Sequence, residues 1–423
     1  MLAVVTGLAL ERAGAASHVS INSNNVLVIN GNNVFPVGLT MPPPLDGRTP
    51  EGKDGLQELA DAGATFMRTG TQGGDWDRAT IEREQQWLDA AAKHGLYCWP
   101  FLRELASIGP KDTKKEAMLR EVVTRFKDHP SLLAWKGVDE PEWGKHPLAP
   151  LLRARDIIRE LDSNHPIAII QAPRGTVQSL RAYNAAGDIT GMDIYPVGYP
   201  PGTHSLLTNK NLSLVGDHTR IIMEAAEGKL PVWMVLQIAW SGVIKPGKTL
   251  RFPTFPEERF MIYQAIINGA RGLNFFGGNL PTSLNAEDVK LGWNWTFWRR
   301  VLRPLLDEIG PKSPLYPALV ASDSKLPIKV TGINGVEFCV READNNLFIL
   351  ACKREGDTVN ITFSGLPAIA ADGEVMFESP RAVKVGDGRF SDWFAPFEVH
   401  VYRFSLQHRI TTRSRRPEVA TTK

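Results

Sequence analysis

The sequence is poor in cysteine. Three cysteines occur among 423 residues, and they form neither a CxxC pair nor a spacing typical of metal ligands. Cys339 and Cys352 flank a predicted hairpin, but a turn near Asp344 and Asn345 would not place them opposite each other. We therefore favour free thiols over a disulfide at this hairpin.

Long hydrophobic runs and net charge are also scarce. No stretch approaches the roughly 20 apolar residues that a membrane-spanning helix needs, so we expect no membrane segment. The formal net charge of +2 gives no reason to expect nucleic acid as a partner. Neither His146 nor His204 has a second ligand at metal spacing, so we expect no metal and no cofactor. The composition does not fix the oligomeric state.

What the chain does contain is a regular alternation of short apolar segments and helical patterns. We expect eight strands, at residues 35–41, 64–70, 96–102, 133–139, 167–173, 188–196, 231–240 and 272–278. Eight strand-helix units predict an α/β fold of the (β/α)8 TIM-barrel type over residues 17–312. This range begins with a small predicted β-hairpin within 18–33. An open doubly wound sheet fits less well, because no Gly-rich phosphate loop follows the first strand.

The two ends of the chain differ from this pattern. Residues 313–406 read as short alternating strands without a helical stripe, which predicts a C-terminal antiparallel β-sandwich. Residues 1–16 resemble the end of a secretory signal peptide, so we expect a secreted or periplasmic protein. Residues 407–423 lack apolar content, and we expect a disordered tail.

The segment 133–143, LAWKGVDEPEW, is the one on which the functional interpretation depends. An apolar strand ends there in Asp139 and Glu140 and is stopped by Pro141. An Asp-Glu-Pro tripeptide alone is more often a solvated turn than a site. In a barrel, however, the carboxyl ends of the strands carry the chemistry, which favours a catalytic Glu140.

These residues resemble the (β/α)8 glycoside hydrolases that carry an acid/base glutamate at the end of strand four. In the large retaining clan that strand ends Asn-Glu-Pro, and here Asp139, Glu140 and Pro141 stand at those positions. The clan's strand-two arginine corresponds to Arg68 and its strand-six tyrosine to Tyr195. The resemblance covers residues 18–312 and implies a glycosidase that cleaves an oligo- or polysaccharide, with Glu140 as general acid/base.

One departure from the clan leaves the second catalytic group open. Strand seven offers Gln237 where the clan has its nucleophilic glutamate. Either Asp139 assists an acetamido group of the substrate, as in N-acetylhexosaminidases with an Asp-Glu pair, or Asp193 at the end of strand six acts as base or nucleophile. A separation of about 5 Å from Glu140 would indicate retention, and roughly 6.5 to 9.5 Å inversion.

Two other function classes remain as alternatives. A carbohydrate-binding barrel without hydrolysis is consistent with the missing strand-seven glutamate. An aldolase-like enzyme lacks an obvious Schiff-base lysine, and Lys136 shares the alternating face of Glu140 only if its strand is regular. For substrate binding we expect contributions from side chains at strand ends, although each ring alone is more often core: Arg68, Tyr195, Gln237, Trp143, Trp240, Trp99 and Tyr199.

Overall fold

The computed structural model describes residues 14–71, 73–240, 246–332, 335–368 and 372–406. The expected signal segment falls mainly, and the expected tail wholly, outside these described residues. Among them, no helix is both long and apolar enough to cross a membrane.

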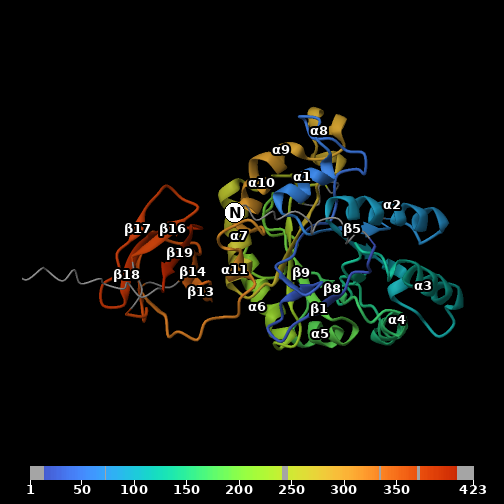
Figure 1. The fold of residues 1–423 in the computed structure, drawn as a ribbon, viewed down its shortest axis with the longest axis horizontal. Coiled ribbons are helices and arrows are strands. Elements are labelled where there is room, and N and C mark those ends of the chain that lie inside the picture. The colour runs from blue at the N-terminus through green and yellow to red at the C-terminus, as the bar shows by residue number, and fades with distance from the viewer. Residues whose placement is uncertain (1–13, 72, 241–245, 333–334, 369–371, 407–423) are drawn as a thin grey trace, which may run out of the picture.

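The larger part of the chain is a closed barrel of eight parallel strands (Figure 1). The strands pair in the order β4-β5-β6-β7-β8-β9-β10-β11, and β11 closes onto β4. Each coincides with one of the eight predicted segments: β4 (Val37–Leu39), β5 (Phe66–Gly70), β6 (Tyr97–Phe101), β7 (Trp135–Asp139), β8 (Ile167–Gln171), β9 (Ile189–Asp193), β10 (Val232–Gln237) and β11 (Gly272–Phe276). The predicted (β/α)8 fold is therefore confirmed.

Helices surround the barrel because their apolar stripes pack on the outer face of the strands. They are α1 (Gly55–Ala62), α2 (Arg78–His94), α3 (Thr113–Phe126), α4 (Leu148–Leu161), α5 (Val177–Ala182), α6 (Leu214–Ala226), α7 (Phe255–Ile267), α8 (Ala286–Leu291), α9 (Trp295–Phe297), α10 (Arg303–Ile309) and α11 (Tyr316–Leu319). Four short helical turns accompany them: η1 (Arg103–Ala106), η2 (Tyr183–Ala186), η3 (Pro281–Ser283) and η4 (Trp298–Leu302).

A small N-terminal sheet covers the amino end of the barrel. The predicted hairpin is a three-stranded antiparallel sheet, because a third strand follows the two expected ones: β1 (Val19–Ile21), β2 (Leu27–Ile29) and β3 (Asn32–Val34). Val19 and Leu27 belong to the same core cluster as Phe66 and Ile189, the first residues of β5 and β9. This sheet blocks one end of the barrel and leaves the carboxyl ends of the strands open.

The C-terminal part forms two antiparallel sheets that pack face to face, as the predicted sandwich requires. One sheet has the order β12-β15-β18 and the other β13-β14-β19-β16-β17. Their strands are β12 (Lys329–Thr331), β13 (Val336–Ala343), β14 (Asn346–Lys353), β15 (Val359–Ser364), β16 (Gly373–Met376), β17 (Ala382–Val383), β18 (Arg389–Phe394) and β19 (Val399–Ser405). Cys339 pairs with Leu350 rather than with Cys352, and all three cysteines are free thiols.

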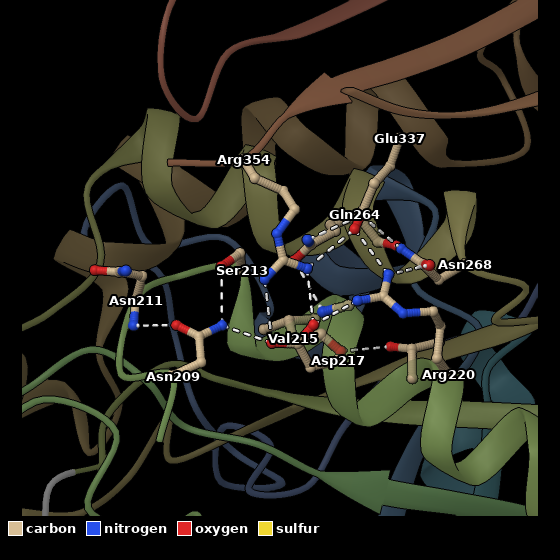
Figure 2. A network of polar contacts seen from close by, with 12 residues as sticks. Asn209, Asn211, Ser213, Val215, Asp217, Arg220, Gln264, Asn268, Glu337 and Arg354 are labelled. Carbon is tan, nitrogen blue, oxygen red and sulfur yellow. Dashed lines mark hydrogen bonds and ion pairs between the residues drawn. The ribbon is translucent and has the colours of Figure 1, made fainter. Parts of the chain in front are cut away.

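The sandwich lies against one side of the barrel, where β13 and β14 face α7 (Figure 1). Apolar side chains of β14, including Phe348 and Leu350, belong to the same core cluster as Phe260 of α7. A polar network borders this apolar contact (Figure 2). In it, Arg354 donates to Asp217 over 2.7 Å and to Glu337 over 3.1 Å. The two domains therefore share both a hydrophobic core and a set of paired charges.

Candidate functional site

A pocket with a cavity volume of about 270 Å³, partly open to solvent, lies at the carboxyl end of the barrel. Seven of the eight strands contribute to it, through residues within them or directly after them. The lining comprises Thr40, Arg68, Lys136, Asp139, Glu140, Trp143, Ile170, Arg174, Asp193, Tyr195, Thr203, His204, Val235, Trp240, Lys248, Asn274 and Phe276. The carboxyl ends of barrel strands are where enzymes of this fold place their active sites, so this pocket is the candidate site.

Glu140 lies in this pocket, directly after the last residue of β7. Its backbone N–H donates to the carbonyl of Ile170 over 2.8 Å, and its φ of 46° turns the chain out of the strand. The side chain keeps 20% of its surface exposed. The Nε2 atom of His204 lies 3.6 Å from its Oε1, beyond hydrogen-bonding distance. Glu140 thus faces an open pocket and is not held in a close salt bridge.

An irregularity in β7 brings Lys136 and Asp139 to the same side. The pairing of β7 with β8 shifts register between these two residues, and a bulge of this kind re-aims the side chains that follow it. In a regular strand residues three apart point to opposite faces. Here both line the pocket, and Lys136 Nζ donates to Asp139 Oδ1 over 2.6 Å. The shift therefore builds an ion pair beside Glu140.

The ion pair determines the charge of both partners. Burial raises the pKa of Asp139, but the charges of Lys136 and Arg68 outweigh it and bring the pKa below its usual value. The Asp139 carboxylate is therefore ionised, and 45% of its side chain is exposed because it faces the pocket. Burial also lowers the pKa of Lys136, although Asp139 opposes this shift.

Asp193 has the opposite protonation behaviour. It ends β9, and both Asp193 and Tyr195 line the pocket, as their alternation along the chain predicts. Burial, together with the neighbouring charges of Glu140 and Asp139, raises the pKa of Asp193 well above its usual value. Burial and these neighbouring charges therefore favour the protonated form of Asp193.

Glu140, Asp193 and His204 form the group most suited to holding a metal ion within the described part of the chain. One ligand atom from each lies within 4.8 Å of the others, although the sequence spacing of His204 gave no such indication. The nearby charges of Arg68 and Lys136 disfavour a divalent cation at this position. The expectation of a metal-free site remains a prediction.

Aromatic rings form one wall of the pocket. The His204 ring stacks on Tyr195, with ring centres 5.0 Å apart and planes 2° apart. Trp240 contacts both rings and Phe276. Trp143 is 52% exposed and lies beneath the guanidinium of Arg174, 5.3 Å from its ring centre. Trp143, Trp240 and Tyr195 therefore lie where the sequence analysis expects substrate contacts.

Three other predicted binding residues are not in the lining, and the substrate contacts expected of Trp99 and Gln237 need correction. Trp99 is fully buried one layer below, against Phe66 and Trp233 in the barrel core. Gln237 is also fully buried, and its amide exchanges two hydrogen bonds with the backbone of Val197, which leaves it as a core amide. Tyr199 is 66% exposed and lies outside the lining, so its substrate contact stays a prediction.

The structure also places in the pocket several residues that sequence reasoning missed. Arg174 and Lys248 lie on loops after β8 and β10, where no periodic pattern marks them. Asn274 lies on β11, donates to Thr40 over 2.6 Å, and keeps a buried Oδ1 without a partner. Its place on the last predicted strand is a signal that the sequence did offer.

The fold and the pocket define a (β/α)8-barrel protein with a C-terminal β-sandwich and a charged cleft at the barrel mouth. No family model matches the sequence, and neither does any curated protein. Solved structures with the same fold include one described as a glycoside hydrolase, with 13% identity and a TM-score of 0.61 over 92% of this chain and 97% of its own. A glycoside hydrolase family 5 protein from Bacteroides vulgatus has 14% identity and a TM-score of 0.60, with 92% of each chain covered. An Anoxybacillus alpha-amylase has 9% identity and a TM-score of 0.56, with 92% and 100% covered. Likeness at these identities establishes the fold.

Proposed function

We propose that the protein is a glycoside hydrolase, with Glu140 as general acid/base. The observation that carries this proposal is the combination, in one pocket, of Glu140 with an ionised carboxylate, Asp139, and with a second carboxyl, Asp193, whose pKa is raised. Cleavage of a glycosidic bond needs a proton for the leaving oxygen and a negative charge for the developing oxocarbenium ion. Solved structures of the same fold that carry glycoside hydrolase names support a carbohydrate substrate.

Of Glu140 and Asp193, Glu140 is the group that delivers the proton. Its side chain is twice as exposed as that of Asp193, 20% against 10%, and lies on the strand-four side of the pocket. Asp193 is buried, and burial together with the charges of Glu140 and Asp139 raises its pKa. Its raised pKa makes it a poor nucleophile, because the attacking form of a carboxyl is the ionised one.

Asp139 is the better candidate for the second role. It is ionised, faces the pocket and is held in place by Lys136 over 2.6 Å. It suits either direct stabilisation of the oxocarbenium ion or orientation of an acetamido group of the substrate. The pair of Glu140 and Asp193 does not suit inversion, because oxygens within 4.8 Å leave no room for an attacking water between them.

A non-hydrolytic binding barrel is the second candidate, and one observation favours it. β10 contributes no carboxylate to the pocket, because its terminal Gln237 is bonded to the backbone of Val197. The aldolase-like alternative is weaker, since the Nζ atom of Lys136 donates to Asp139 over 2.6 Å, whereas an imine needs a free amine.

The test is a screen of neutral, acidic and N-acetylated oligosaccharides with the full chain, in which the release of reducing ends is measured. We expect hydrolysis of at least one class, and a fall in kcat of about 10²- to 10⁴-fold in Glu140→Gln. Glu121→Gln, at an exposed position of α3, is the matched control and should keep full activity. Undiminished activity of a folded Glu140→Gln would remove the assignment. Melting protection by a glycan without any reducing-end release would favour the binding barrel.

A further inference from the structure

The pocket contains more cationic than anionic groups. Arg68, Lys136, Arg174 and Lys248 line it together with three carboxyls, Asp139, Glu140 and Asp193, and burial raises the pKa of Asp193. Lys136 is committed to Asp139. Among the residues that the structure describes, none forms an ion pair of 4 Å or less with Arg68, Arg174 or Lys248. A neutral sugar would leave this excess positive charge uncompensated.

Arg68 is the strongest sign of a missing anion. It is only 8% exposed, and its Nε has no hydrogen-bond partner within the described residues. Its close neighbour is the ring of Phe101, 5.3 Å from the guanidinium carbon, and Asp139 attracts it only from a longer distance. A guanidinium retains its proton in proteins, so this charge cannot be removed by titration. A buried arginine without a hydrogen-bonded carboxylate costs free energy that a bound anion would offset.

Arg174 and Lys248 extend the positive charge towards the entrance. The guanidinium of Arg174 stacks on the exposed ring of Trp143, which keeps it oriented while its Nε has no partner. Lys248 approaches from the loop after β10 and is half-buried. Arg68, Arg174 and Lys248 therefore come from three separate segments of the chain and meet in one pocket.

We infer that the sugar bound in this pocket is acidic and carries a carboxylate, as in a hexuronic acid, which these cations recognise. The inference deepens the proposed function and rests on it for the nature of the substrate. A carboxylate suits the site because its two oxygens match the planar fork of an arginine in a bidentate contact. Asn274, with its unpartnered Oδ1 on the pocket floor, offers an acceptor for a sugar hydroxyl.

The experiment measures binding, so that it does not depend on hydrolysis. Calorimetry on full-length Glu140→Gln compares uronate oligosaccharides, the same oligosaccharides after reduction of their carboxyl groups, and sulfated oligosaccharides. We expect the uronates to bind at least about tenfold more tightly than their carboxyl-reduced forms, since a hydrogen bond to a charged group is worth this much. The preference should weaken as NaCl is added.

Three substitutions made in the Glu140→Gln background locate the contact. Arg68→Gln, Arg174→Gln and Lys248→Gln should each reduce uronate affinity, and the carboxyl-reduced sugars should be unaffected. Arg174 and Lys248 are near the entrance, so their variants remain informative if Arg68→Gln fails to fold. Arg78→Gln is the control, because Arg78 is exposed on α2 and pairs only with Glu82.

The outcomes separate the two proposals. Equal affinity for acidic and carboxyl-reduced sugars, binding of sulfated sugars alone, or no binding of uronates would overturn the inference. Hydrolysis confined to neutral glycans would overturn it while leaving the glycosidase proposal intact. Carboxylate-selective binding by a protein whose unsubstituted form hydrolyses nothing would support the inference and refute the glycosidase.

Discussion

Two charged regions of this molecule differ in how far their charges are paired within the chain. At the contact between barrel and sandwich, each charge has a partner: Arg354 and Arg220 both contact Asp217 and Glu337, and Asn268 also donates to Glu337 (Figure 2). At the barrel mouth Lys136 pairs with Asp139, but Arg68, Arg174 and Lys248 form no ion pair with any residue that the structure describes. The first arrangement satisfies its charges within the chain and stabilises the fold. The second leaves charge available, which is the arrangement a ligand-binding site needs.

The largest expected effect comes from removing the ionised carboxylate at the mouth. Asp139→Asn should reduce kcat by about 10²- to 10³-fold, because a neutral amide cannot balance the positive charge of the transition state. Steady-state kinetics on the substrate found in the glycan screen provides the measurement. The matched change at the contact, Asp217→Asn, should leave kcat within about twofold. If both variants lost activity equally, the distinction between the two regions would fail.

The next effect concerns stability and lies at the contact. Asp217 accepts hydrogen bonds from Arg354 and Asn209, and only 20% of its side chain is exposed. Asp217→Asn should reduce the free energy of unfolding by about 2 kcal/mol, between the values for exposed and fully buried pairs. Urea unfolding followed by fluorescence measures this loss. Glu121→Gln should change it by less than about 0.5 kcal/mol. A neutral result for Asp217→Asn would mean that the network adds no stability.

The sequence predicts the strands that carry these regions better than it predicts the contacts between their charged side chains. Apolar runs mark all eight barrel strands, and the position of Glu140 at the end of one of them follows from Pro141. The ion pair of Lys136 and Asp139 depends on a register shift that no residue pattern in the sequence predicts. Trp99 was assigned to the mouth because its strand ends there, but a ring two residues before the strand end lies one layer deeper, in the core.

Loop residues were the least predictable part of the site. His204 approaches Glu140 and Asp193 from a loop that is distant in sequence. Arg174 and Lys248 reach the same pocket from two other loops. Gln237 was predicted to bind substrate but does not line the pocket, since its side-chain amide forms hydrogen bonds with the backbone of Val197. Such contacts depend on tertiary geometry, which a period-two or period-3.6 pattern does not encode.

The two regions should also respond oppositely to pH. Burial raises the pKa of Asp217, but its bonds to Arg354 and Asn209 outweigh this and lower it, so its stabilisation holds above about pH 4 and is lost as the pH falls. The raised pKa of Asp193 means that the folded protein holds a proton which the unfolded chain releases above about pH 4. Asp193 therefore makes the protein less stable as the pH rises.

Melting temperatures between pH 3 and pH 8 test this contrast. Relative to the unsubstituted protein, Asp193→Asn should gain stability as the pH rises from 4 to 8, because it has no carboxyl to ionise. The deficit of Asp217→Asn should shrink as the pH falls towards 3. Parallel pH profiles for the two variants would mean that the carboxyls share one kind of environment.

The smallest expected effect lies at the outer edge of the mouth. Trp143 is half exposed and contacts Arg174, so its replacement removes a stacking surface without opening the core. Trp143→Ala should raise KM by about 3- to 10-fold, as loss of a ring contact worth roughly 1 kcal/mol predicts, and kcat should stay constant. Trp393→Ala, an equally exposed ring on β18 of the sandwich, is the control and should change neither constant. A fall in kcat for Trp143→Ala would place this ring against the reacting part of the substrate, and the division between an outer binding edge and an inner catalytic group would then need revision.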